Sequence, residues 1–111
     1  MIYTEALNKR NSEKIERIRS RAMDSAKKVA VLLKEKYGAK RVILFGSITR
    51  KAYLHEGSDI DLLVEGIKKD ELLHAGFDAC VVAAPFDVDI IPLETAHKEI
   101  VDAAKEKGME L

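Results

Sequence analysis

Aromatic residues are scarce in this 111-residue sequence, which has three Phe, three Tyr and no Trp. Proteins that bind single-stranded nucleic acid stack bases on aromatic side chains, so the scarcity argues against a nucleic-acid partner. The sequence has one cysteine, Cys80, which excludes an internal disulfide, and no Cys or His neighbours it at zinc-finger spacing. We therefore predict that Cys80 is a small core residue.

Long apolar segments are also missing. The sequence has no run long enough to span a membrane and no apolar stretch typical of a signal peptide. With 47% hydrophobic and 34% charged residues, its composition is that of a globular domain. We predict a single domain over residues 1–111, with an N-terminal helical segment (1–37) and a core (38–111), located in the cytoplasm without a membrane partner.

Charge is divided unevenly along the chain, although the net charge is zero. Residues 1–41 hold 12 Lys and Arg against 5 Asp and Glu, and the remainder holds 7 against 14. The basic half could attract RNA or an acidic protein, or it could simply be solvated. A solvated helix face is the commonest of these outcomes.

A long amphipathic helix is predicted from about Ser12 to Tyr37, capped by Asn11 or Ser12 and ended by Gly38. Apolar residues recur there at spacings of three and four, forming one stripe: Ile15, Ile18, Ala22, Ala26, Val29 and Leu33. The basic first half of this helix has no core to cover in so small a domain. We therefore expect it to mediate association, with a second copy or with a partner.

The central motif begins with four β-forming residues, Val42 to Phe45, followed by Gly46 and Ser47. This pattern predicts a strand that is covered on both faces and ends in a sharp turn. A Gly lets phosphate oxygens approach the backbone amides, and the hydroxyl of Ser47 can donate to the same oxygens. Arg50 follows three residues after Ser47, where its guanidinium can reach a phosphate.

Eleven residues after Ser47, Ser58 leads into Asp59 and Asp61, which open a second apolar run. Side chains two apart in a strand point to one face, so both carboxylates are presented together. Paired carboxylates hold Mg²⁺ when substrate phosphates complete its coordination. The two halves of the motif predict a site for a nucleoside triphosphate with a divalent metal ion; the alternative is a strand end with two solvated acids.

Two further helices and a strand are predicted in the second half of the chain. A helix over 69–83 is expected to bury one side, formed by Leu72, Leu73, Phe77, Cys80, Val81 and Ala84. A strand from Phe86 to Ile91 carries Asp87 and Asp89 on one face. The final helix, 93–107, is expected to point Ala96, Ile100, Val101 and Ala104 inward and to end at Gly108.

The segments LFGSITR and SDIDLLVE resemble the signature of the polymerase-beta-like nucleotidyltransferase superfamily, and in particular its minimal (MNT-type) branch. The similarity covers roughly residues 25–111. It implies an α/β (α+β) fold, with a small mixed sheet flanked by helices. In this family a third carboxylate lies in a Val-Asp-aliphatic-aliphatic string, which Val88 to Ile91 match.

The resemblance also implies an activity: transfer of a nucleoside monophosphate, AMP from ATP, using two Mg²⁺ ions that Mn²⁺ can replace. Catalysis and metal binding would fall to Asp59, Asp61 and Asp89. Nucleotide binding would fall to Gly46, Ser47, Arg50 and Ser58. Members are often paired with a HEPN-domain protein as an antitoxin, and the acceptor is then a hydroxyl on that partner. The alternative is a binding module that neutralises the partner by contact alone.

Overall fold

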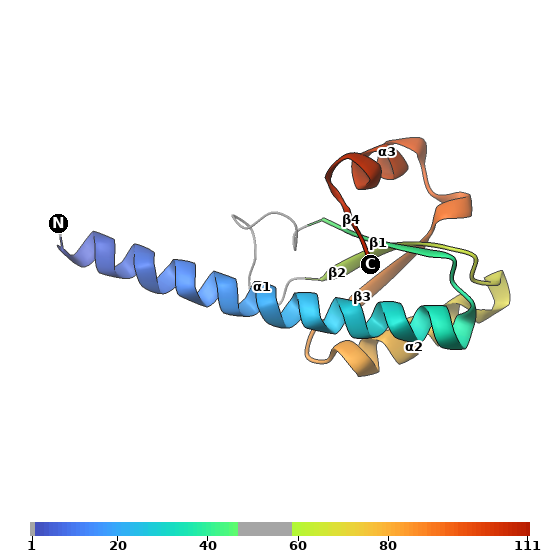
Figure 1. Ribbon diagram of the computed structural model, residues 1–111, viewed down its shortest axis with the longest axis horizontal. Helices are drawn as coiled ribbons and strands as arrows, with labels where there is room; N and C mark the ends of the chain where they lie inside the picture. The colour runs from blue at the N-terminus through green and yellow to red at the C-terminus, as the bar shows by residue number, and fades with distance from the viewer. Residues whose placement is uncertain (1, 47–58) are drawn as a thin grey trace.

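The computed structural model describes the backbone of residues 2–46 and 59–111 and the side chains of residues 13–46 and 59–111. Figure 1 shows one long helix running past a small sheet that carries further helices. The elements follow in the order α1 (Ile2–Tyr37), β1 (Arg41–Phe45), β2 (Ile60–Glu65), η3 (Lys69–Glu71), α2 (Leu72–Ala83), β3 (Val88–Pro92), η4 (Leu93–Thr95), α3 (Lys98–Lys107) and β4 (Met109–Glu110).

Helix α1 is continuous from Ile2 to Tyr37, so the predicted cap at Asn11 or Ser12 was wrong. The predicted apolar stripe is confirmed, because its members from Ile18 to Leu33 are buried and Ile15 packs against them. Gly38 ends the helix with a φ of +72°, a conformation that glycine adopts readily. Despite this length, no helix among the described residues is apolar enough to cross a bilayer.

The sheet has four strands in the order β3-β2-β1-β4. β1 is antiparallel to β2 and β4, whereas β2 and β3 are parallel, so the sheet is mixed as predicted. β2 and β3 therefore begin at the edge where β1 ends. We call this edge the carboxylate edge, because Asp59, Asp61 and Asp89 all lie in sequence at these strand starts.

Helices cover both faces of the sheet. On one face, Val42, Leu44 and Leu62 belong to a core cluster with the buried residues of α1 and α2. On the other face, Ile43 and Leu63 pack with Ala104 of α3. The inward residues predicted for the last helix all belong to this second cluster, which confirms that part of the prediction: Ala96, Ile100, Val101 and Ala104.

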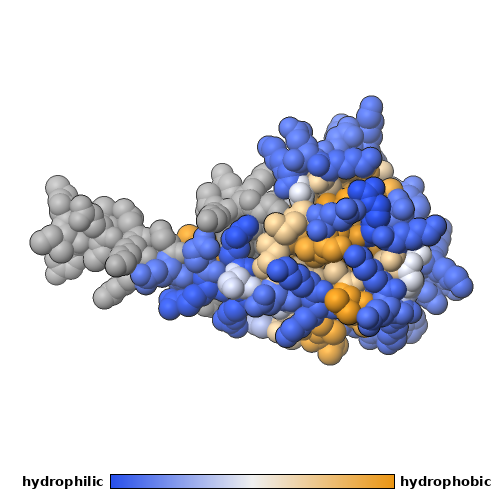
Figure 2. Space-filling view, viewed as in Figure 1, coloured by the Kyte–Doolittle hydropathy of each residue, from blue (hydrophilic) through white to orange (hydrophobic). Residues whose placement is uncertain are grey.

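Helix α2 buries a different side from the one that the sequence predicted. Leu73, Phe77 and Val81 were expected to be inward, but their exposed fractions are 72%, 67% and 77%. The side that faces the core is formed instead by Ala75, Ala79 and Ala83, whose small side chains allow close approach to α1. We call Leu73, Phe77 and Val81 the α2 stripe, and Figure 2 shows hydrophobic surface at the lower margin, over α2.

Polar contacts fix the C-terminal end of α1 and the C-terminal end of the chain to the domain. Asp78 of α2 accepts hydrogen bonds from Lys36 Nζ at 2.7 Å and from the hydroxyl of Tyr37, which fixes α1 against α2. The short strand β4, which the sequence did not predict, pairs with Ile43 and Leu44 of β1. The half-buried Cys80 lies beside β3, where the amide of Val88 donates to its Sγ at 3.4 Å.

Candidate active site

Two acids of the motif are neighbours across the parallel strands at the carboxylate edge. Asp61 is the second residue of β2 and Asp89 the second residue of β3, and the two occupy opposite positions in the β2–β3 register. Asp59 precedes β2 directly. The amide of Ile60 donates to the carbonyl oxygen of Asp87 at 2.8 Å, which extends the pairing of the two strand starts. The sheet thus fixes the backbone that carries these carboxylates.

Strand alternation decides which face the acids occupy. Ile60 and Leu62 are buried in the cluster beneath α1 and α2, so Asp61, which lies between them, points to the other face. Asp89 lies between Val88 and Ile90 of that same cluster and has the same orientation. The carboxylates therefore lie on the side of the sheet opposite to α1 and α2.

The acids also interact electrostatically. Burial, followed by the charges of Asp89 and Asp59, raises the pKa of the Asp61 carboxyl from its ordinary value of 3.8 to about 6. Asp61 is half-buried, whereas Asp59 and Asp89 are exposed. Since neighbouring negative charges disfavour the ionised form, Asp59 and Asp89 add to the effect of burial in opposing the ionisation of Asp61.

Gly46 closes the site from the side of β1. It directly follows Phe45, which pairs in register with Asp61, and it has a φ of +86°. A Cβ atom at this position would lie 2.5 Å from Oδ2 of Asp61. Only glycine lets the backbone approach the carboxylate this closely, so the Gly of the motif is required by the local geometry.

The donor set fits a divalent metal ion. Mg²⁺ and Mn²⁺ prefer carboxylate oxygens, and mutually repelling carboxylates gain most from a bound cation. Asp59, Asp61 and Asp89 supply such oxygens at one edge. Over residues 13–46 and 59–111, no three His, Cys, Asp or Glu side chains form a ready-made ligand cluster. The fit therefore rests on donor chemistry and on the repulsion felt by Asp61.

The structure does not place the remaining predicted site residues beside Asp61 and Asp89. Ser47, Arg50 and Ser58 lie outside the described residues, as does the short helix predicted from Ile48 to Tyr53. Asp87 is exposed, and its charge is not among those that raise the pKa of Asp61. The structure therefore relates Asp89, and not Asp87, to Asp61, a distinction that strand alternation alone did not make.

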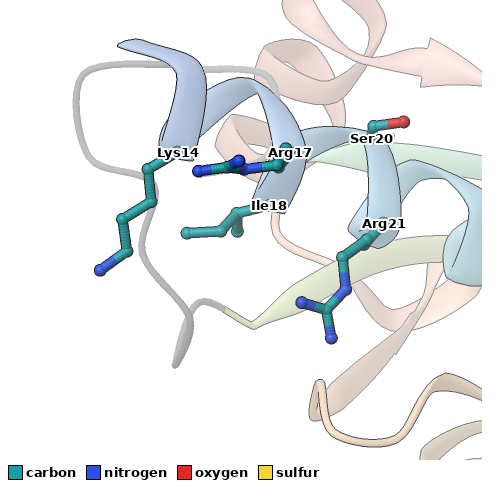
Figure 3. A pocket seen from close by; sticks show the side chains of 5 residues that line it. All are labelled: Lys14, Arg17, Ile18, Ser20 and Arg21. Carbon is teal, nitrogen blue, oxygen red and sulfur yellow. The ribbon is translucent and has the colours of Figure 1, made fainter. Parts of the chain in front are cut away.

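Sequence reasoning did not identify a hollow on α1. It has a volume of about 370 Å³ and is lined by Lys14, Arg17, Ile18, Ser20 and Arg21 (Figure 3). The basic composition of this segment was visible in the sequence. The convergence of its side chains was not, because it depends on where α1 leaves the core.

Solved structures with this fold include toxin–antitoxin complexes. A chain from the complex of a tri-AMPylated HEPN toxin with an MNT antitoxin, from Shewanella oneidensis, is 19% identical with a TM-score of 0.61; the match covers 80% of this chain and 70% of that one. A chain from a toxin–antitoxin complex with AMP-PNP is 22% identical with a TM-score of 0.64, covering 77% and 70%. These likenesses establish the fold.

Sequence comparisons give the family. A search among curated proteins found no match. The model of the nucleotidyltransferase domain matches residues 26–110, a span that contains β1, β2 and β3 together with Gly46, Asp59, Asp61 and Asp89. Because this match covers most of the chain, the protein belongs to the nucleotidyltransferase domain family.

Proposed function

We propose that the protein is a metal-dependent nucleotidyltransferase that moves AMP from ATP to a hydroxyl group on a partner protein. The observation that supports this most directly is the register that sets Asp61 opposite Asp89, together with the repulsion that Asp59 and Asp89 exert on Asp61. A nucleotidyltransferase domain needs a cluster of acids of this kind to neutralise a triphosphate through metal ions.

Each carboxylate has a proposed role. Asp59, Asp61 and Asp89 would hold two Mg²⁺ ions, which Mn²⁺ can replace. Ions bound there would lower the pKa of the attacking hydroxyl and stabilise the charge that develops on pyrophosphate. Asp89 accepts the proton of the acceptor hydroxyl at a carboxylate oxygen.

The transfer is an in-line displacement at the α-phosphorus. A bond forms between the acceptor oxygen and this phosphorus, and the bond from phosphorus to the oxygen that bridges to the β-phosphate breaks. The bonding electrons leave with pyrophosphate. Gly46 and Ser47 cradle the phosphates, Ser58 contributes a further hydroxyl, and Arg50 balances the charge of the leaving group.

The proposed acceptor is a HEPN-type protein, so the chain would act as the antitoxin-like half of a pair. Among the structures that share the fold, one contains an AMPylated HEPN toxin and another contains AMP-PNP. Those proteins are 19% and 22% identical to this chain, and their contents suggest the partner and the nucleotide that we propose.

Intact-mass spectrometry of the chain co-expressed with a HEPN-type neighbour from its genome tests the proposal. We expect the partner to gain the mass of one or more AMP groups, and Asp59→Ala and Asp61→Ala each to abolish the gain. Asp87→Asn is the matched control, because its carboxylate is exposed nearby and does not act on Asp61. Tight binding without any mass change in the wild type would instead identify a binding module that neutralises by contact.

A further inference from the structure

The sheet holds the start of β3 from one side. β3 is the edge strand in the order β3-β2-β1-β4, so β2 is its one neighbour among the described strands. The amide of Ile60 in β2 donates to the carbonyl oxygen of Asp87 at 2.8 Å. Successive residues of a strand turn their backbone polar groups to opposite edges, so Asp87 and Asp89 bond toward β2. Val88, which lies between them, therefore turns its amide and its carbonyl outward.

The thiol of Cys80 in α2 satisfies both outward groups of Val88. The amide of Val88 donates to Sγ at 3.4 Å, and Sγ donates to the carbonyl oxygen of Val88 at 3.6 Å. A thiol is both a donor and an acceptor, so one side chain serves both groups. Val88 is buried, and its backbone polar groups need a partner within the protein. Cys80 thus takes the place of a neighbouring strand at this point.

The connection between α2 and β3 makes this contact part of a short turn. α2 ends at Ala83 and β3 begins at Val88 (Figure 1). Within the turn, the amide of the buried Phe86 donates to the carbonyl oxygen of Ala83 at 2.9 Å. Cys80 lies three residues before Ala83, about one helical turn, and its side chain reaches across to Val88. The end of α2 and the start of β3 are therefore fixed to each other.

Asp89 follows Val88 directly and depends on this backbone for its position. Its side chain is exposed. Within residues 13–46 and 59–111, no side chain makes a hydrogen bond or an ion pair with its carboxylate. Among the described contacts, the backbone at Val88 and Asp89 therefore sets the direction of this carboxylate. β2 holds that backbone on one side, and Cys80 holds it on the other.

We propose that Cys80 is a positioning residue of the carboxylate edge: its thiol holds the start of β3 so that the Asp89 carboxylate stays opposite Asp61. α2 packs on the face of the sheet opposite to the carboxylates, so Cys80 acts through Val88 and does not touch the reacting groups. A residue that only fills the core needs volume, whereas this role needs the two hydrogen bonds. The inference rests on the proposed function, in which Asp89 binds metal and accepts a proton.

Two substitutions at Cys80 separate hydrogen bonding from packing. Cys80→Val keeps an apolar side chain of comparable size and removes both hydrogen bonds, whereas Cys80→Ser keeps a donor and an acceptor. Asp78→Ala is the matched control on the same helix. It removes the hydrogen bonds from Lys36 and Tyr37 of α1 and leaves the contact with β3 in place. Urea denaturation establishes that each variant is folded under the assay conditions.

Backbone amide hydrogen exchange, followed by NMR, tests the geometry without any ligand. Rates are compared with those of the core amides of β2, which report unfolding of the whole domain. In Cys80→Val the amide of Val88 should exchange about tenfold faster on this scale, and Cys80→Ser should restore most of the protection. Asp78→Ala should leave the relative rate within about twofold. Unchanged protection of Val88 in Cys80→Val would overturn the proposal.

Metal binding and AMP transfer test the consequence for the site. Calorimetry of Mn²⁺ binding in the presence of a non-hydrolysable ATP analogue should show about tenfold weaker binding in Cys80→Val. Losing a group that orients a metal ligand costs about 10–100-fold in affinity or activity, and the lower value suits an effect through the backbone. The kcat for AMP transfer should fall by a similar factor, while the KM for the partner stays within about twofold. Cys80→Ser should recover most of both losses.

The results separate this inference from the proposed function. If the wild type binds Mn²⁺ but transfers no AMP, the proposed function is wrong, and a loss of Mn²⁺ affinity that Cys80→Ser restores still supports the positioning role. Equal losses in Cys80→Val and Asp78→Ala would show that only the stability of α2 matters and would overturn it. A Cys80→Ser variant as defective as Cys80→Val would do the same, because the hydrogen bonds would then not be the cause.

Discussion

Asp61→Asn should stabilise the protein at neutral pH in the absence of divalent metal ions. Folding raises the pKa of the Asp61 carboxyl from 3.8 to about 6, so between these values the folded state binds more protons than the unfolded state. The free energy of unfolding of the wild type therefore falls as the pH rises through this window. Asparagine has no charge to repel Asp89 and Asp59, so the variant escapes this loss.

The size of the effect follows from the shift. A shift of about two pKa units corresponds to about 3 kcal/mol at most, at about 1.4 kcal/mol per unit. Asp61 is only half-buried, and solvent screening reduces this to about 1–2 kcal/mol. For a domain of this size, the melting temperature should rise by about 4–8 °C for each kcal/mol.

Urea denaturation of the wild type, Asp61→Asn and Asp87→Asn at intervals from pH 4 to pH 8, with a chelator present, measures the effect. The advantage of Asp61→Asn over the wild type should grow between pH 4 and about pH 7 and then level off. Asp87→Asn should show no such trend. An advantage that does not change with pH, or an Asp61→Asn variant less stable than the wild type at pH 8, would refute the reasoning.

Four further expectations follow from the site and from α1. Asp89→Asn should abolish AMP transfer while Asp87→Asn keeps most of it, as intact-mass spectrometry would report; the reverse pattern would mean that the wrong carboxylate was assigned. ATP should bind with Mg²⁺ or Mn²⁺ only, so calorimetry giving equal affinity with a chelator would contradict a metal site. Gly46→Ala should cost about 1–3 kcal/mol in urea denaturation, because the new Cβ would meet Asp61 at a positive φ; an unchanged midpoint would refute that geometry. Deleting residues 2–12 should leave the melting temperature nearly unchanged but reduce association in light scattering, and unaltered association would show that this part of α1 is only a solvated extension.

The motif strands were predictable because short-range patterns specify them. Apolar residues alternate around Asp61, and a run of β-forming residues precedes Gly46. In a sheet that is covered on both faces, these patterns are compatible with few structures other than strands. The residues alone did not predict that Asp61 and Asp89 meet at one edge of the sheet, because this depends on β2 and β3 being parallel. The resemblance to a known family supplied that step, and the structure then related Asp89 to Asp61.

The orientation of α2 was mispredicted for a definite reason. Large apolar residues were assumed to be buried, yet α2 packs on α1 through Ala75 and Ala79, and Phe77 remains at the surface. Size and hydrophobicity do not reveal which face of a helix meets a neighbour of small residues. The strand β4 was missed because its two residues are too few to form a pattern.

The parallel pairing of β2 with β3 also bears on how fast the site forms. Asp61 and Asp89 are 28 residues apart in sequence and meet only after the crossover through α2 has closed. The antiparallel β1–β2 pair has no such requirement, so contacts across β2 and β3 belong to the late steps of folding. The carboxylates then do not yet repel one another in the transition state for folding. A substitution that removes the charge of Asp61 should therefore slow unfolding and leave the folding rate almost unchanged.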